Sequence, residues 1–170
     1  IIESKIKDIE VFIINDLGTT DFNAHLRQYD SVHGQFPYKV KSSKTSINAG
    51  LGPIKIFSER NPEDLPWKKL DVDVVLECTG IFTDKAKASL HINAGAKRVL
   101  ISAPSKDADI TVVYGVNHQK IRKSHKVISN ASCTTNCLAP VAMVLDKLCG
   151  INQGYMTTVH AFTGDQAILD

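Results

Sequence analysis

Blocks of apolar residues separated by turn residues predict the elements at the start of the chain. Residues 9–14 are a β-branched apolar run closed by the turn residues at 15–18, which is typical of a buried strand. Residues 20–29 predict a short helix, which their first two residues, a threonine and an aspartate, can cap. The mixture of glycine, proline and polar residues that follows, at 30–37, indicates irregular structure.

A hairpin is predicted next. Residues 45–49 and 54–58 read as two strands on either side of the turn at 50–53, which contains two glycines and a proline. The glycines do not indicate a phosphate-binding loop, because Lys55 stands where a third glycine would be needed.

The middle of the chain predicts a strand, a helix and a second strand with short connections. Residues 72–78 form an apolar strand, Asp84 can cap the helix that follows, Gly95 ends it, and residues 98–101 form the next strand. This order is typical of a parallel sheet in an α/β fold. Further strands of the sheet are predicted at residues 110–114 and 126–129.

The last third predicts a long amphipathic helix over residues 132–148, in which the apolar positions recur at helical spacing. Pro140 lies inside it and deprives the Asn136 carbonyl of its usual donor, so we expect a bend or an irregular second turn. Residues 154–159 predict a strand that ends close to His160.

Composition narrows the class of protein without naming its activity. The chain has 170 residues, of which 43% are apolar and 22% charged, enough for one domain with a real core. Its 20 Lys and Arg against 18 Asp and Glu leave a charge of +2, with no basic run, so we expect no nucleic-acid partner. We also expect no membrane partner, because no apolar stretch approaches the roughly 18 residues of a bilayer span, and no signal peptide at the start.

Cys133 is the first candidate for chemistry. It lies in a run of capping residues that leads directly into the long helix. If Ser132 or its neighbour caps that helix, the Cys133 sulfur lies on the first turn, where free N–H groups and the helix dipole stabilise an anion. Such a position lowers the pKa of a thiol and makes it nucleophilic. The other cysteines have no such context. We interpret Cys137 as a small pocket residue, and we expect Cys78 and Cys149 to lie in the core.

His160 is the second candidate, because it lies at the predicted end of a strand, a common position for functional side chains. Beside Cys133, its imidazolium would stabilise the thiolate and its neutral ring would accept a proton. A satisfied, partly buried histidine is the plainer interpretation. A zinc site of Cys133, Cys137 and His160 lacks an evident fourth ligand, so we expect no metal.

Asp16 is a candidate for nucleotide binding. A carboxylate at the end of a strand can accept both hydroxyls of a ribose, and no basic residue stands beside it to bind a 2′-phosphate, which favours NAD over NADP. An ordinary turn aspartate fits the same position. Only fifteen residues precede Asp16 and they hold no Gly-x-Gly-x-x-Gly turn, so we expect a nucleotide domain without its first strand and Gly-rich turn.

One longer motif indicates a specific protein family. Residues 131–140 read ASCTTNCLAP, which resembles the active-site signature of phosphorylating glyceraldehyde-3-phosphate dehydrogenases. Matching segments extend over almost the whole chain: ND at 15–16, YDSVHG at 29–34, SER at 58–60, LPW at 65–67, CTG at 78–80, ISAP at 101–104 and HAFTGDQ at 160–166.

The resemblance implies a mechanism and residue roles. A cysteine thiolate, here Cys133, would attack the substrate aldehyde with His160 as base; hydride would pass to NAD, and inorganic phosphate would cleave the thioester to an acyl phosphate. The family's cofactor contacts would fall on Asn15, Asp16, Arg60, Thr79, Gly80, Phe82 and Ser102. Its phosphate contacts would fall on Ser132, Thr134, Thr163 and Asp165.

The resemblance also implies a fold and a setting. We expect an α/β fold with a Rossmann-type doubly wound parallel sheet, an NAD-binding domain over residues 1–132, and the start of an α+β catalytic domain over residues 133–170. The family implies a cytoplasmic, glycolytic homotetramer acting on glyceraldehyde 3-phosphate. Because the rest of the family's catalytic half does not occur in these 170 residues, we expect the isolated piece to have little activity.

Three other functions fit part of the sequence. Oxidation of erythrose 4-phosphate belongs to the same family, although residues 138–140 favour the triose. A Cys/His hydrolase would need Cys133 and His160 but no NAD, which the cofactor-side segments argue against. A silent binding or redox-sensing fragment would keep a reactive thiol without forming NADH.

Overall fold

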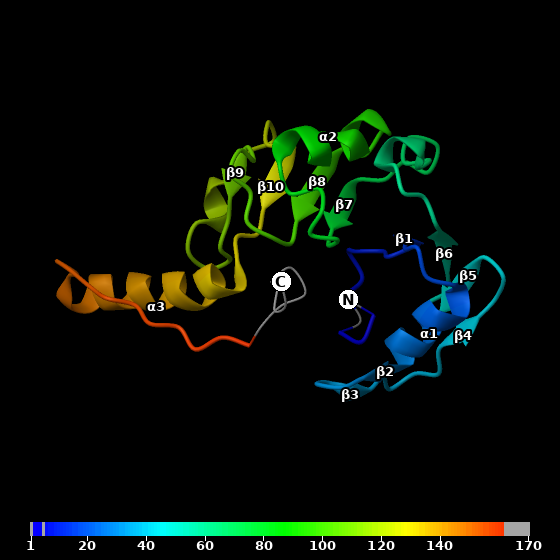
Figure 1. Cartoon of the computed structure of the whole chain (residues 1–170), viewed down its shortest axis with the longest axis horizontal. Helices are drawn as coiled ribbons and strands as arrows, with labels where there is room; N and C mark the ends of the chain where they lie inside the picture. Colours follow the sequence, from blue (N-terminus) through cyan, green and yellow to red (C-terminus); the bar gives the residue numbers. More distant parts are fainter. Residues whose placement is uncertain (1, 5, 162–170) are drawn as a thin grey trace, which may run out of the picture. The chain divides into compact units, whose positions relative to one another are not determined.

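The computed structural model describes residues 2–4 and 6–161, which divide into two compact units, Ile1–Leu65 and Pro66–Asp170 (Figure 1). Each unit has its own sheet and its own buried cluster. No helix among the described residues is long and apolar enough to cross a membrane.

The first unit holds a mixed four-stranded sheet in the order β1-β6-β5-β4. Strands β1 (Ile13–Asn15) and β6 (Pro53–Phe57) are parallel, whereas β5 (Ser46–Asn48) pairs antiparallel with both β6 and β4 (Lys41–Ser42). The remaining elements are α1 (Thr20–Gln28), the short hairpin of β2 (Tyr29–Asp30) and β3 (Gly34–Gln35), and η1 (Pro62–Asp64). Ala24 of α1 packs on Ile47 and Ile54, which form the core of this unit.

The predicted hairpin of the first unit is confirmed, and three details of its sequence prediction are wrong. The strand expected over residues 9–14 pairs with β6 only from Ile13, which lies opposite Lys55. The cap of α1 is Thr19, whose side chain accepts the Phe22 N–H, one residue earlier than predicted. Irregular structure was expected over residues 30–37, but Asp30 of β2 pairs with Gly34 of β3, since the Asp30 carboxylate organises the turn between the two strands.

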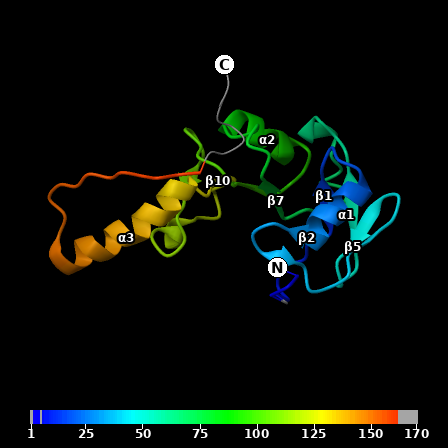
Figure 2. The ribbon, with the colours of Figure 1, turned by 60° about the horizontal axis from the view of Figure 1, so that its bottom comes forward.

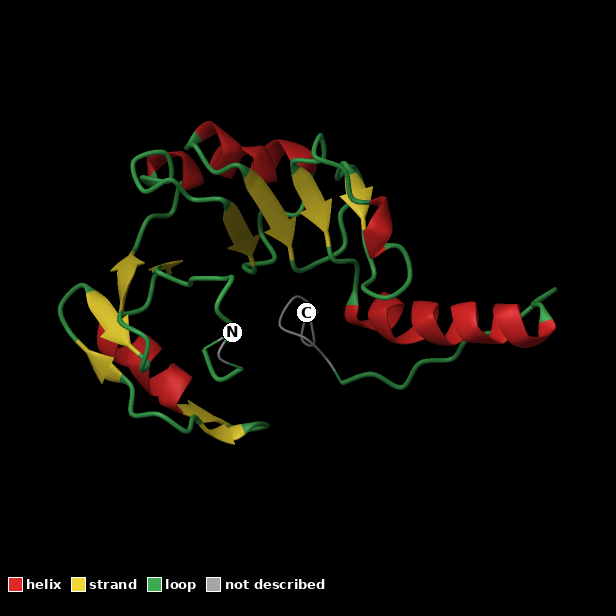
Figure 3. Ribbon diagram, turned by 180° about the vertical axis from the view of Figure 1, so that it is seen from behind, coloured by secondary structure: helices red, strands yellow, loops and turns green. Residues whose placement is uncertain are grey.

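The second unit holds an all-parallel sheet in the order β7-β8-β10-β9, whose arrows point the same way in Figure 3. The strands are β7 (Val74–Glu77), β8 (Arg98–Ile101), β9 (Ile110–Thr111) and β10 (Val127–Ser129). The helices are α2 (Lys85–Asn93), η2 (His118–Lys120) and α3 (Cys133–Cys149). This confirms the predicted strand, helix and strand of a parallel α/β unit.

Alternation along the strands decides which side chains face α2. Val99 and Ile101 of β8 are buried with Ala88 of α2 and Val127 of β10, and they form the core of the second unit. Val75 and Glu77 of β7 lie on the same face, because side chains two residues apart share a face. A carboxylate therefore occupies a position where the pattern of the strand calls for an apolar residue.

Two predictions for the end of the chain differ from the structure. Helix α3 continues through Pro140 without an irregular turn. The strand predicted at 154–159 is absent from the described residues: this segment forms no regular structure, and the Val159 side chain is fully exposed. β-Branched residues favoured a strand there, but a strand needs a neighbour to supply its hydrogen bonds.

The parallel register brings the ends of three strands of the second unit to one edge. Glu77, Ile101 and Ser129 are aligned across β7, β8 and β10. Parallel strands expose their carboxyl ends at the same edge, where α/β proteins bind ligands. The segments that leave this edge contain Thr79, Ser102 and Cys133.

We expect the substitution Gly95→Ala to lower the free energy of unfolding by about 3 kcal/mol, which urea unfolding of the complete polypeptide would measure. Gly95 has φ +110°, and a Cβ there would lie 2.6 Å from the Lys68 backbone. The control Gly154→Ala meets no atom within 4 Å, so it should change stability by less than about 0.5 kcal/mol. Equal effects of the two substitutions would contradict the prediction.

Candidate active site

A sharp change of direction after β10 positions the start of α3. Ala131 is buried and has φ +58°, a left-handed conformation that is costly for a residue with a Cβ. The Ala131 N–H donates to Ser129 Oγ at 3.1 Å, and this hydroxyl donates in turn to the Ala103 carbonyl at 2.7 Å. The fully buried Ser129 thus holds the bend from which the helix begins.

Ser132 caps α3, as predicted. Its Oγ accepts the Thr135 N–H at 3.0 Å and lies 2.8 Å from Thr135 Oγ1. Cys133 is therefore the first residue of a 17-residue helix, where the positive end of the dipole favours a thiolate.

The segment after α3 returns His160 to the beginning of the same helix. It leaves α3 at Gly150 and runs back along it, as Figures 1 and 2 both show. His160 Nε2 lies 3.1 Å from Cys133 Sγ, and His160 Nδ1 hydrogen-bonds the Ala161 carbonyl. A carbonyl only accepts, so Nδ1 carries a proton and Nε2 is the atom that exchanges a proton with the sulfur.

The two groups shift each other's pKa toward an ion pair. The hydrogen bond from His160, followed by that from the Thr134 backbone N–H, lowers the pKa of the Cys133 thiol. The Ala161 carbonyl, followed by Cys133 itself, raises the pKa of His160. Both side chains are exposed, so the arrangement is an accessible nucleophile with a proton carrier beside it.

The other three cysteines lack this environment. Cys78 and Cys149 are exposed, so the prediction that they fill the core is wrong; both lie at positions that the sheet and the helix leave uncovered. Cys137 is exposed one helical turn after Cys133. The described residues contain no group of three or more His, Cys, Asp or Glu side chains arranged to hold a metal ion.

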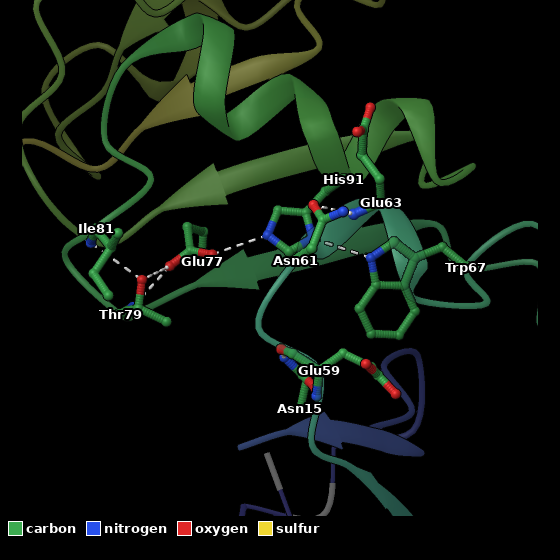
Figure 4. A network of polar contacts seen from close by, with 9 residues as sticks. All are labelled: Asn15, Glu59, Asn61, Glu63, Trp67, Glu77, Thr79, Ile81 and His91. Carbon is green, nitrogen blue, oxygen red and sulfur yellow. Dashed lines mark hydrogen bonds and ion pairs between the residues drawn. The ribbon is translucent and has the colours of Figure 1, made fainter. Parts of the chain in front are cut away.

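In the first unit, Asn15 and Asp16 lie at the carboxyl end of β1 but behave differently. The Asn15 amide is used within the fold: it donates to the Glu59 carbonyl and accepts the Glu59 N–H, both at 2.9 Å (Figure 4). It thereby holds the chain just before Arg60, which is exposed. The exposed Asp16 carboxylate accepts through Oδ1 from the Gly18 N–H at 2.7 Å and from the amide of the buried Asn23 at 3.2 Å.

In the second unit, the predicted cofactor residues lie in the segments after β7 and β8. Thr79 and Gly80 are exposed at the end of β7, and Phe82 makes an edge contact with His91. Ser102 is exposed after β8, where its N–H donates to the Glu77 carbonyl at 3.0 Å. The predicted phosphate contacts Ser132 and Thr134 lie beside Cys133. The remaining two predicted phosphate contacts, Thr163 and Asp165, fall outside the described residues.

Comparison of the sequence with known proteins identifies the family of this chain. Residues 1–85 match the sequence model of the glyceraldehyde 3-phosphate dehydrogenase NAD binding domain, and residues 132–170 match that of the C-terminal domain. The chain belongs to the glyceraldehyde-3-phosphate dehydrogenase family. Its nucleotide part is accordingly a Rossmann-type α/β domain whose cofactor is NAD.

Individual members of the glyceraldehyde-3-phosphate dehydrogenase family are similar over the whole chain. The enzyme named glyceraldehyde-3-phosphate dehydrogenase of Xanthobacter flavus is 62% identical and that of Cereibacter sphaeroides 58%, both over all 170 residues. That of Pseudomonas aeruginosa is 57% identical over 96% of the chain. The chain spans 51%, 50% and 49% of these three relatives, about half of their length.

Sequence reasoning missed two groups of residues in this member of the family. Ser129 and Ala131 shape the bend before Cys133, and nothing in a Ser-Asn-Ala segment indicates a left-handed alanine. Glu77 and His91 form a buried pair at 2.9 Å. A signal for this pair existed: Glu77 is a charged residue at an inward position of an apolar strand.

Proposed function

We propose that the complete polypeptide containing this chain oxidises glyceraldehyde 3-phosphate with NAD and inorganic phosphate. The observation that carries the proposal is the contact of 3.1 Å between Cys133 Sγ and His160 Nε2 at the start of α3, in a member of this family. A nucleophilic thiol is required because a thioester, unlike a free acid, keeps the acyl group reactive toward phosphate.

The residues support the following sequence of bond changes. The Cys133 thiolate adds to the aldehyde carbon, and the N–H groups of the first turn of α3 face the negative charge. His160, protonated beside the thiolate, first gives its Nε2 proton to the oxyanion of the adduct. The neutral ring then takes that hydroxyl proton back as the C–H bond of the adduct breaks, leaving a thioester on Cys133. NAD, when bound, accepts the hydride. Phosphate attacks the thioester, the C–S bond breaks, and the thiolate is regenerated beside imidazolium as acyl phosphate leaves.

Asp16 suits the adenosine ribose of NAD. Among the described residues, its hydrogen bonds end on Oδ1, which leaves Oδ2 to accept from ribose hydroxyls. The Gly18 N–H and Asn23 fix the orientation of the carboxylate before the cofactor binds. The same negative charge would repel a 2′-phosphate, which supports selectivity for NAD over NADP.

We expect Asp16→Asn to weaken NAD binding about 10- to 100-fold, the value of one or two hydrogen bonds to a charged group. Asparagine keeps an oxygen for Gly18 and Asn23 but presents an amide to the ribose. The control Asp21→Asn removes an equal charge from the same unit at a carboxylate that accepts from Ser42 at 2.6 Å. Calorimetric titration of both variants with NAD is the measurement, and equal affinities would contradict a ribose role for Asp16.

The remaining site residues take roles by family resemblance. We assign Ser132 and Thr134 to the attacking phosphate, Thr163 and Asp165 to the substrate phosphate, and the Arg60 backbone, Thr79, Gly80, Phe82 and Ser102 to NAD. Asn15 contributes by holding Glu59 and hence the backbone at Arg60. We also infer a nucleotide domain over residues 1–132, a catalytic domain from residue 133, and a cytoplasmic homotetramer, whose subunit number native mass would test.

The deciding experiment follows NADH formation by the complete polypeptide with NAD, phosphate and either glyceraldehyde 3-phosphate or erythrose 4-phosphate. The proposal requires NADH in repeated turnovers with the triose, and only a single stoichiometric burst when phosphate is omitted, because the thioester then persists. A faster rate with erythrose 4-phosphate would assign the other activity of the family. Ester hydrolysis without NAD, or an alkylatable thiol without NADH, would overturn the proposal.

A further inference from the structure

A chain of hydrogen bonds, buried except at Thr79, connects the core of the second unit to the segment after β7 (Figure 4). It consists of Trp67, His91, Glu77 and Thr79, and we call it the buried relay. Trp67 Nε1 donates to His91 Nδ1 at 3.1 Å, and His91 Nε2 lies 2.9 Å from Glu77 Oε2. Glu77 Oε1 accepts both the N–H and the hydroxyl of Thr79, at 2.8 and 2.5 Å.

The chemistry of the donors fixes every proton of the buried relay. An indole N–H can only donate, so His91 Nδ1 is an acceptor and the proton of the ring resides on Nε2. That proton points at Glu77, whose carboxylate receives three hydrogen bonds in all. Burial favours the neutral acid, yet the hydrogen bonds from His91 and Thr79 outweigh it and lower the pKa of Glu77.

Stability alone does not account for a carboxylate at this position. Glu77 is 4% exposed and His91 5% exposed. Taking such groups out of water costs several kcal/mol, and a well-packed apolar pair is often as stable. The neighbouring inward positions, Val75 and Val99, show that the sheet accommodates apolar side chains there.

The far end of the buried relay determines what Thr79 can offer a ligand. Its hydroxyl donates to Glu77 and accepts the Ile81 N–H at 3.1 Å, so toward solvent it has only a lone pair left. Its backbone N–H is used as well. Gly80, which lies between Thr79 and Ile81, has φ +76°. A Cβ there would meet no atom within 4 Å, so the Gly80 backbone is open to a ligand.

We propose that Glu77, oriented by His91 and Trp67, is a positioning residue for NAD binding, and that it acts by holding Thr79–Gly80–Ile81 as a rigid, hydrogen-bond-accepting loop at the carboxyl end of β7. This inference rests on the proposed function, because it takes that loop as part of the NAD site. Thr79 serves the cofactor as an acceptor for a ribose hydroxyl, and Glu77 serves it only through Thr79.

Glu77→Gln tests the proposal in the complete polypeptide. The amide nitrogen of the glutamine must face either His91 Nε2–H or the two donors of Thr79. In both orientations its N–H groups point at other donors, and we expect the loop to be released. We expect the Kd and the KM for NAD to rise about tenfold while kcat at saturating NAD changes less than about threefold. The control Val99→Ala removes buried volume from the same sheet; it should lower Tm and leave the Kd unchanged. Equal changes of Kd in both variants would reduce Glu77 to a structural role and overturn the proposal.

Thr79 supplies a second test that does not disturb the core, because its side chain is exposed. Thr79→Val leaves Glu77 and His91 paired but removes the hydroxyl, and should raise the Kd for NAD as Glu77→Gln does. Thr79→Ser keeps the hydroxyl and should retain the affinity. If neither Thr79→Val nor Glu77→Gln lowers the affinity for NAD, this inference alone is overturned. If the unsubstituted protein does not bind NAD, the proposed function is overturned with it.

Discussion

Replacement of Cys133 by serine should abolish aldehyde oxidation while NAD still binds. Serine keeps the cap geometry of α3 and nearly the volume of the thiol. Its hydroxyl stays neutral near pH 7, however, because neither a helix dipole nor His160 lowers an alcohol pKa enough to form an alkoxide. We expect the rate of NADH formation to fall by roughly 10³-fold or more, the scale of losing an enzyme nucleophile.

The companion variant Cys137→Ser distinguishes a specific loss from general thiol chemistry. Cys137 is exposed on the same helix, one turn further on, and its replacement should leave the rate within about threefold. Steady-state NADH formation and calorimetric NAD titration of both variants are the measurements. A Cys133→Ser enzyme that retained a tenth of the rate would exclude the thioester route.

The part of this site that sequence predicts is the part made by local interactions. Ser132 as the cap of α3, Asp84 as the cap of α2 and the bounds of β8 follow from side chains within a few residues of each other. The placement of Cys133 on the first turn is of this kind, because capping preferences alone start the helix there. The hairpin of β5 and β6 is local in the same sense.

The part that sequence does not predict depends on residues far apart in the chain. The pairing of Glu77 with His91 spans fourteen positions and that of Asn15 with Glu59 forty-four. No periodicity encodes such contacts, although a lone charge in an apolar strand indicates that a buried partner exists. The strand expected at 154–159 shows the converse error: β-propensity describes fitness for a sheet, and this segment has no paired strand among the described residues.

His160→Asn should slow aldehyde oxidation by about 10²- to 10⁴-fold, the usual contribution of a positioned general base. The contact with Cys133 Sγ at 3.1 Å gives this histidine two separable effects. As imidazolium it stabilises the thiolate before substrate binds. As neutral imidazole it removes the proton that must leave as hydride is transferred.

The pH dependence of thiol alkylation isolates the first effect. In the folded protein the pKa of Cys133 lies below its ordinary 9.0 and that of His160 above its ordinary 6.5. Thiolate is therefore present at pH values where a free cysteine is protonated, and it is lost only as pH falls through the lowered pKa. Without His160 the alkylation profile of iodoacetamide should move to higher pH, toward that of an ordinary thiol.

Comparison of the two measurements assigns the remaining loss. The alkylation profile of His160→Asn gives the pH at which its thiol is fully ionised. Any deficit in NADH formation that persists at that pH belongs to proton removal rather than to thiolate formation. His125→Asn is the matched control, because His125 accepts from the Arg122 backbone and does not contact the sulfur. An unchanged alkylation profile in His160→Asn would show that the helix start alone activates Cys133; a normal NADH rate would remove His160 from catalysis.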